Sequence, residues 1–208
     1  MAWEFDILYW ISNNLHGVDF INRVVHFFTI FGESSIVWFA SAIVLLFIKK
    51  YRRLGITIIL AMILIAGFNN YIFKPLVARP RPFLENEGAG LVSFVETIFH
   101  PVFVIGGKEV WGVPDSYSFM SGHSVSGLLA GTIFFLYDKK KFWPFLVLGI
   151  LMGLSRLFLL VHYPTDILAG FAFGAIMGTG VHFLSAWIGK NFYAPESKNI
   201  NKVNNQIG

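Results

Sequence analysis

The sequence predicts an all-α fold, a polytopic membrane helical bundle of about five or six spans. Hydrophobic residues make up 55% of the 208 positions and charged residues only 13%, whereas about a quarter of the positions in a soluble domain are charged. Long apolar runs recur along the chain, and lysine and arginine gather in the connections between them. The cysteine count of zero excludes disulfides, thiol catalysis and thiolate metal sites.

Five segments are apolar enough to cross a hydrocarbon core about 30 Å thick, which takes about 20 helical residues. They are 27–48, 54–73, 121–137, 142–162 and 165–188. The first of them is interrupted by the polar stretch over 32–34. Residues 3–12 mix Trp, Ile and Tyr with acidic side chains, so we expect a helix lying in the membrane interface, with a short sixth span as the alternative.

Basic residues set the expected orientation. They are Lys49, Lys50, Arg52 and Arg53 between the first two segments, Lys139, Lys140 and Lys141 between the third and fourth, and Lys190 after the fifth. The positive-inside rule makes these three places cytoplasmic, so the long loop over 74–120 faces outside or the periplasm. We expect one membrane-embedded domain over 1–189 in the inner or plasma membrane, and a polar cytoplasmic tail over 190–208.

Two further patterns predict local structure. Within the outer loop, apolar residues recur at roughly helical spacing over 91–99, which predicts a short surface helix. In the fifth segment, glycines follow a small-residue spacing that predicts close packing of helices. These glycines are Gly170, Gly174, Gly178 and Gly180.

Polar and ionisable residues at the outer ends of the apolar segments form three clusters. In chain order these are Lys74, Arg79 and Arg81, then Ser121, Gly122 and His123, then Ser155, Arg156, His162 and Asp166. Ionisable groups are costly in a bilayer, so each cluster is expected to be functional. The predicted topology brings all three to one extracytoplasmic level, where guanidinium groups and the free N–H groups of a helix N-terminus favour a bound phosphate.

The two histidines and the aspartate add chemistry to this binding site. Asp166 follows His162 by four residues, close enough for the carboxylate to fix the imidazole tautomer and leave one nitrogen as a nucleophile. His123 is then expected to protonate the leaving oxygen. This combination predicts in-line phosphoryl transfer through a phosphohistidine. A metal site built from the same three residues is the alternative, disfavoured because the surrounding cations would repel a metal ion.

These residues resemble the three-part signature of the type 2 phosphatidic acid phosphatase family, a lipid phosphate phosphatase and vanadium haloperoxidase superfamily. The matching parts are Lys74 with Arg81-Pro82, then Ser121-Gly122-His123, then Ser155-Arg156 with His162 and Asp166. Small bacterial undecaprenyl diphosphate phosphatases and B-type phosphatidylglycerophosphate phosphatases belong to this family. The resemblance implies a helical phosphatase that uses no metal and no other cofactor.

The resemblance also implies a role for each residue. His162 would be the nucleophile, Asp166 its orienting partner and His123 the general acid. The implied phosphate-binding residues are Lys74, Arg81, Ser121, Gly122 and Arg156.

Three residues lie outside this assignment. Arg79 is expected either behind the phosphate-binding residues or against the lipid headgroup, and Ser155 behind them as well. Met120 stands where the family usually has proline, so we expect a looser start to the third span without loss of a catalytic group.

The predicted activity is removal of a terminal phosphate from a lipid at the outer leaflet, with undecaprenyl diphosphate favoured. The alternative substrates are phosphatidylglycerophosphate, phosphatidate and lipid A phosphates. A phosphotransferase and a haloperoxidase are alternatives of the same fold. A transporter is the alternative from another class, but the first two spans offer only Ser41 and Thr57 at mid-depth. Membrane lipids are the expected partners and nucleic acid is not, and no pattern indicates an oligomeric state.

Overall fold

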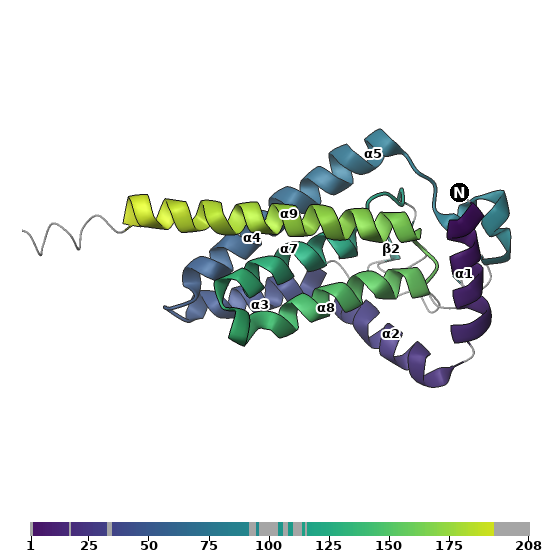
Figure 1. Cartoon of the computed structure of the whole chain (residues 1–208), viewed down its shortest axis with the longest axis horizontal. Helices are drawn as coiled ribbons and strands as arrows, with labels where there is room; N and C mark the ends of the chain where they lie inside the picture. The colour runs from purple at the N-terminus through teal and green to yellow at the C-terminus, as the bar shows by residue number, and fades with distance from the viewer. Residues whose placement is uncertain are drawn as a thin grey trace, which may run out of the picture.

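The computed structural model describes residues 2–16, 18–32, 35–91, 95, 104–105, 108–109, 114 and 116–193. Helices make up nearly all of this part of the chain (Figure 1). The longer helices are α1 (Ala2–Leu15), α2 (Asp19–Gly32), α3 (Ile36–Phe47), α4 (Arg52–Gly67), α7 (Gly122–Tyr137), α8 (Lys139–Phe158) and α9 (Pro164–Ile188). The shorter elements are η2 (Phe68–Phe73), α5 (Lys74–Val77), η3 (Pro82–Leu84), η4 (Asn86–Leu91), β1 (Val104–Ile105), β2 (Lys108–Glu109) and η5 (Gly189–Tyr193).

The predicted all-α membrane class is confirmed. Within the described residues, three helices are long and apolar enough to cross a bilayer, namely Arg52–Leu84, Lys139–Phe158 and Pro164–Asn191. The apolar helices α3 and α7 are shorter, with 12 and 16 residues. At a rise of 1.5 Å per residue they extend about 18 and 24 Å, less than the hydrocarbon thickness. The number of spans therefore stays a prediction.

The predicted first span over 27–48 is wrong, because the chain forms two helices there. α2 ends at Gly32 and α3 begins at Ile36. Ser35 between them takes a left-handed backbone conformation with a φ of 60°, which no right-handed helix can include. α2 consequently leaves the line of α3 and packs against α8 instead (Figure 1).

The fourth predicted span, 142–162, ends too late. α8 stops at Phe158, and the left-handed Leu160 (φ 59°) turns the chain before α9 starts at Pro164. His162 therefore lies in a tight connection between two helices. The other predicted segments agree with the structure: 54–73 falls within one long helix that includes the π-helical turn η2, while 121–137 and 165–188 match α7 and α9 to within a residue.

α7 is the central helix of the bundle, and α8 and α9 flank it (Figure 1). Its residues from Ser124 to Phe134 are all buried, as expected for a helix that is apolar on every side. The glycine prediction is confirmed at three positions, where an added Cβ would lie within 2.7 Å of an α7 atom: Gly170, Gly174 and Gly178. It is wrong for Gly180, where an added Cβ would meet nothing within 4 Å.

The two ends of the bundle differ in chemistry. At one end, the buried face of α1 packs on the connection from α8 to α9, with Phe5 edge-on against Tyr163 at 5.6 Å between ring centroids. At the other end, the α3–α4 and α7–α8 connections meet, since the Lys141 amine donates to the Tyr51 hydroxyl at 2.8 Å. The basic residues of both connections therefore gather at the end of the bundle remote from α1 (Figure 1).

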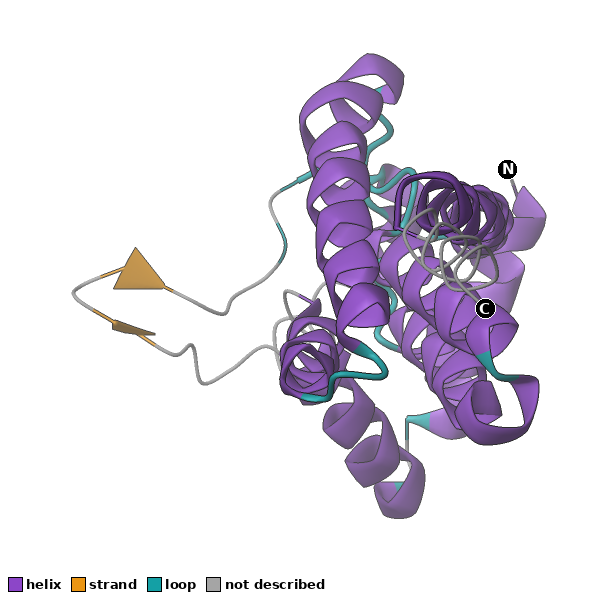
Figure 2. Ribbon diagram, turned by 90° about the vertical axis from the view of Figure 1, so that its left-hand side faces the viewer, coloured by secondary structure: helices purple, strands orange, loops and turns teal. Residues whose placement is uncertain are grey.

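The loop over 74–120 contains α5, η3, η4 and an antiparallel pair of two-residue strands that stands apart from the helices in Figure 2. The surface helix predicted over 91–99 falls mainly on residues outside the described part of the chain. So does nearly all of the tail predicted over 190–208, of which only residues 190–193 are described.

The glycine contacts predict a position-dependent loss of stability. An added Cβ at Gly174 would lie 2.4 Å from the Val125 carbonyl oxygen, and a backbone atom cannot yield as a flexible side chain can. We expect Gly174→Ala to lower the free energy of unfolding by about 1–3 kcal/mol. Gly180→Ala, on the same helix, is the matched control and should stay within about 1 kcal/mol of wild type. Thermal unfolding in detergent micelles measures both, and equal midpoints would contradict the packing described here.

Candidate active site

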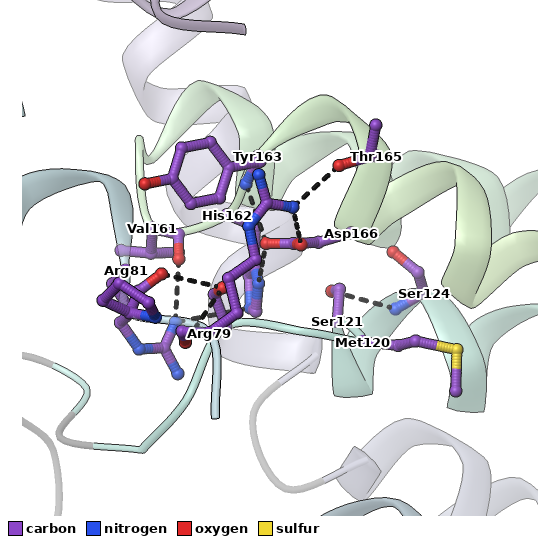
Figure 3. A network of polar contacts seen from close by, with 12 residues as sticks. Arg79, Arg81, Met120, Ser121, Ser124, Val161, His162, Tyr163, Thr165 and Asp166 are labelled. Atoms are coloured by element: carbon purple, nitrogen blue, oxygen red, sulfur yellow. Dashed lines mark hydrogen bonds and ion pairs between the residues drawn. The ribbon is translucent and has the colours of Figure 1, made fainter. Parts of the chain in front are cut away.

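The start of α9 fixes one histidine–carboxylate pair. Pro164 occupies the first helical position and Asp166 the third, from where its Oδ2 accepts a 2.9 Å hydrogen bond from the backbone N–H of Tyr163. The fully buried Asp166 is thereby turned back toward His162, whose Nδ1 lies 3.5 Å from the same oxygen (Figure 3). The second ring nitrogen of His162, Nε2, is left on the opposite edge.

Arg81 from the first cluster reaches that opposite edge. Its Nη1 lies 3.4 Å from His162 Nε2 and donates to the Val161 carbonyl oxygen at 2.8 Å (Figure 3). Its Nε donates to the Ser116 carbonyl oxygen at 2.7 Å, so the guanidinium is held from two sides. Lys74 is also buried, at the start of α5. Two cations of the first cluster, Arg81 and Lys74, thus lie close enough to act on His162 of the third cluster.

The surroundings keep the His162 ring neutral. Burial is the largest cause, and the charges of Arg81, Lys74 and Arg156 add to it, so the pKa of His162 lies well below its ordinary value of 6.5. A neutral imidazole keeps a free lone pair on one nitrogen, which is the form that a nucleophile requires.

The second cluster joins the site through α7. Arg156, in the last turn of α8, donates from Nη2 to Nε2 of His123, in the first turn of α7. The backbone N–H of Ser121 donates to the Asp166 carbonyl oxygen at 3.3 Å, which ties the start of α7 to the start of α9. The structure therefore gathers residues from all three clusters in one place.

The N-terminus of α7 is held by side chains. Ser121 is the N-cap, and its Oγ accepts from the Ser124 backbone N–H at 3.4 Å. Asn69, in the π-helical turn η2, donates to the Met120 carbonyl oxygen at 3.3 Å. Met120 itself is buried in the core cluster. Sequence reasoning did not find Asn69, although a polar residue inside an apolar span is a signal for such a role.

Arg79 and Ser155 are each bonded to other groups of the protein. Arg79 donates from Nη1 to Asp166 Oδ1 and from Nη2 to the carboxylate of Glu4, both at 2.7 Å. Of the two places predicted for Arg79, these contacts favour the one behind the predicted phosphate-binding residues. The Ser155 hydroxyl donates to the Met152 carbonyl oxygen within α8 at 2.8 Å. Sequence reasoning assigned Glu4 to an interfacial helix and did not connect it with the site.

The alternative of a metal site gains no support from the geometry. In the part of the chain that the structure describes, no three His, Cys, Asp or Glu side chains are grouped closely enough to hold a metal ion together. This holds for His123, His162 and Asp166.

Comparison with known proteins now decides the family. The sequence pattern that defines the PAP2 superfamily matches residues 54–190, about two thirds of the chain and all three clusters. The chain belongs to the PAP2 superfamily. The α1 and α2 helices precede the matched stretch.

PAP2 relatives with known roles are similar over most of the chain. An undecaprenyl-diphosphatase of Sulfolobus acidocaldarius is 27% identical over 84% of this chain and 74% of its own length. The undecaprenyl-diphosphatase BcrC of Bacillus subtilis is 26% identical over 82% of this chain and 80% of its own.

The PAP2 fold is also seen in a solved structure. The crystal structure of a transmembrane PAP2 type phosphatidylglycerolphosphate phosphatase from Bacillus subtilis has a TM-score of 0.66. It is 22% identical and covers 92% of this chain and 88% of its own, which establishes the shared fold. Family and relatives together identify this PAP2 protein as a membrane-embedded phosphatase.

The depressed pKa of His162 predicts activity in mild acid. With His162 as the nucleophile, protonation of its ring causes the acid limb of the rate, at the pKa of His162 in the folded protein, which lies below 6.5. We expect the acid limb of kcat/KM to lie below that value after correction for the substrate phosphate, whose own pKa is about 6. Initial rates of phosphate release between about pH 4.5 and 8.5 measure it. A corrected limb above 6.5 would mean that the ring is not held neutral.

Proposed function

We propose that this PAP2 phosphatase removes the terminal phosphate of a lipid diphosphate or phosphate, with undecaprenyl diphosphate as the favoured substrate. One observation carries the proposal: Arg81 contacts His162 and Arg156 contacts His123. These contacts support the two histidines as nucleophile and proton donor and the two arginines as phosphate-binding cations. The names of the two sequence relatives support the choice of lipid. Phosphatidylglycerophosphate, phosphatidate and lipid A phosphates are the alternatives to test.

The phosphate would bind among the buried cations. Lys74, Arg81 and Arg156 are each less than a tenth exposed, and cations in a water-poor site attract a phosphate far more strongly than they would in water. Free N–H groups at the start of α7, beside Gly122, add the favourable end of the helix dipole. An added Cβ at Gly122 would meet nothing closer than Asn69 Nδ2 at 3.9 Å, so there is open space beside these groups.

In the first step, His162 Nε2 attacks phosphorus in line with the leaving oxygen. The bond to phosphorus forms from Nε2, the bond from phosphorus to the lipid-side oxygen breaks, and His123 gives that oxygen a proton. Asp166, 3.5 Å from Nδ1, stabilises the ring as it becomes positive. In the second step, water gives up a proton to His123 and its oxygen displaces Nε2, so that phosphate and neutral His162 are released.

The His123–Arg156 contact fits this sequence. In the structure the guanidinium of Arg156 donates to the same ring nitrogen that would face the leaving oxygen. A phosphate bound between the two side chains would accept the arginine's hydrogen bonds in place of the ring. His123 would then be free to carry and deliver the proton.

The charge distribution supports an extracytoplasmic site. The basic connections around Lys49–Arg53 and Lys139–Lys141 lie at the end of the bundle remote from His162. We propose that this basic end is cytoplasmic, by the positive-inside rule, and that the site opens to the outside or the periplasm. The substrate phosphate would then be presented at the outer leaflet.

Replacing the nucleophile tests the mechanism. We expect His162→Ala to reduce phosphate release by on the order of 10⁴-fold or more, since loss of a covalent nucleophile removes the pathway rather than slowing it. Purified protein would be assayed on undecaprenyl diphosphate, phosphatidylglycerophosphate, phosphatidate and lipid A. His182→Ala, in α9 about 24 Å along the helix from Asp166, is the matched control. Wild-type rates in His162→Ala would end the proposal.

Chelation tests whether metal takes part. We expect activity after EDTA treatment and dialysis to stay within about twofold of the untreated enzyme, because buried cations supply the charge that a metal would supply elsewhere. EDTA saturated with Mg²⁺ beforehand controls for effects of the chelator on the micelle. A loss that one divalent metal restores would favour a metal-dependent reaction.

A further inference from the structure

Glu4 is a buried carboxylate that reaches the active site from the N-terminal helix. It lies in the first turn of α1 and is 0% exposed. It precedes the stretch that matches the PAP2 superfamily by 50 positions, so no signature motif includes it. In Figure 1, α1 lies across the end of the bundle where α8 gives way to α9.

Glu4 joins a closed network of hydrogen bonds. Its Oε2 accepts from Arg79 Nη2 at 2.7 Å, and its Oε1 accepts from the Thr165 hydroxyl at 2.6 Å. Arg79 Nη1 in turn donates to Thr165 Oγ1 and to Asp166 Oδ1, each at 2.7 Å (Figure 3). The single guanidinium of Arg79 therefore bridges two buried carboxylates, one on α1 and one on α9.

This bridge fixes the orientation of Asp166. Oδ1 accepts from Arg79, while Oδ2 accepts from the Tyr163 backbone N–H and faces His162 Nδ1. Both oxygens of the carboxylate are thus committed, and the one that faces the histidine cannot turn away without breaking the bond to Arg79. Arg79 itself is pressed against the Tyr163 ring, 3.7 Å from its centroid.

Anchoring α1 does not explain the buried charges. The helix already buries Phe5, Leu8 and Ile11 against the cluster around Phe158 and Tyr163, and apolar burial of this kind holds a helix without ionic groups. Replacing a buried ion pair by apolar residues often leaves stability unchanged or raises it. The charges are better explained by the direction that they impose on Arg79.

We propose that Glu4 is a positioning residue for catalysis, which holds Arg79 so that Arg79 holds Asp166 against His162. The inference rests on the proposed function, because it takes His162 as the nucleophile. α1 is then part of the active site, and a chain lacking it would keep every signature residue yet catalyse poorly.

Glu4→Gln tests the proposal, because it keeps the shape of the side chain and removes the charge that holds Arg79. Loss of a contact that supports a metal ligand typically reduces activity by about 10- to 100-fold, and we take the same order for the contact that supports Asp166. We expect kcat to fall by that factor and KM to stay within about threefold, since the phosphate-binding residues are untouched. Asp6→Asn neutralises an exposed carboxylate on the same helix and should match wild type. A wild-type kcat in Glu4→Gln, or an equal loss in Asp6→Asn, would overturn the proposal.

A double-mutant cycle separates positioning from anchoring. If Glu4 acts through Arg79, then Glu4→Gln should cost almost nothing further in an Arg79→Ala background. If Glu4 merely anchors α1 through Thr165, its effect should persist in full there, and the proposal fails. Arg79→Lys gives a second test, because a lysine keeps the charge but cannot bridge two carboxylates as a guanidinium does. We expect it to lose kcat like Glu4→Gln, and a wild-type kcat would contradict the bridge.

The same assay series distinguishes the two levels of inference. If the His162→Ala variant retains turnover, the proposed mechanism is wrong, whatever the effect of Glu4→Gln. If His162→Ala abolishes turnover and Glu4→Gln leaves it unchanged, the proposed mechanism is supported and only the positioning role of Glu4 is wrong. Size-exclusion elution and the thermal unfolding midpoint show whether each variant is folded before its kcat is read.

Discussion

The close approach of α7 to its two neighbours is the constraint on which the site depends. An added Cβ at Gly170 would lie 2.7 Å from Ser124 Cβ, and one at Gly149 would lie 2.3 Å from the Gly127 carbonyl oxygen. Helices separated by larger side chains pack with axes 8–10 Å apart. Backbone contact is closer than this, and it allows the first turn of α7 to reach both the last turn of α8 and the first turn of α9. Without it, His123 could not touch Arg156.

The site contains more buried positive charge than its own carboxylate can neutralise. Lys74, Arg81 and Arg156 are buried and all lie close enough for their charges to act on His162. Asp166 is already bonded to Arg79 and to the Tyr163 backbone. Like charges in a water-poor environment repel, so this arrangement costs stability and is relieved by a bound anion. Burial is the largest cause of the lowered pKa of His162, and the same positive charges add to it. The cations proposed to bind phosphate therefore also help to keep His162, the proposed nucleophile, neutral.

Spacing within the chain predicted the helices and the three clusters, because both depend on local patterns. Arg156 was conspicuous as a charge in an apolar run, and His162 and Asp166 as a pair four residues apart. The Glu4–Arg79 bridge could not be predicted in this way, since its partners are 75 residues apart and an acidic residue near a terminus is usually solvated. The separation of α2 from α3 was visible only as a polar interruption, and its direction depends on packing against α8.

α8 ends at Phe158, four residues before the predicted end of the fourth span, and this early end matters for the chemistry of the connection between α8 and α9. A histidine in the middle of a helix presents its ring sideways, to a neighbouring helix or to lipid. Because α8 stops at Phe158, His162 lies where the chain reverses direction. One edge of its ring faces Asp166 in α9, and the other edge faces Arg81 in the loop over 74–120. The proposed in-line attack needs both contacts, because a carboxylate then orients one ring nitrogen while the other faces the cations proposed to bind phosphate. The early end of α8 is therefore the local feature on which the proposed role of His162 as nucleophile depends.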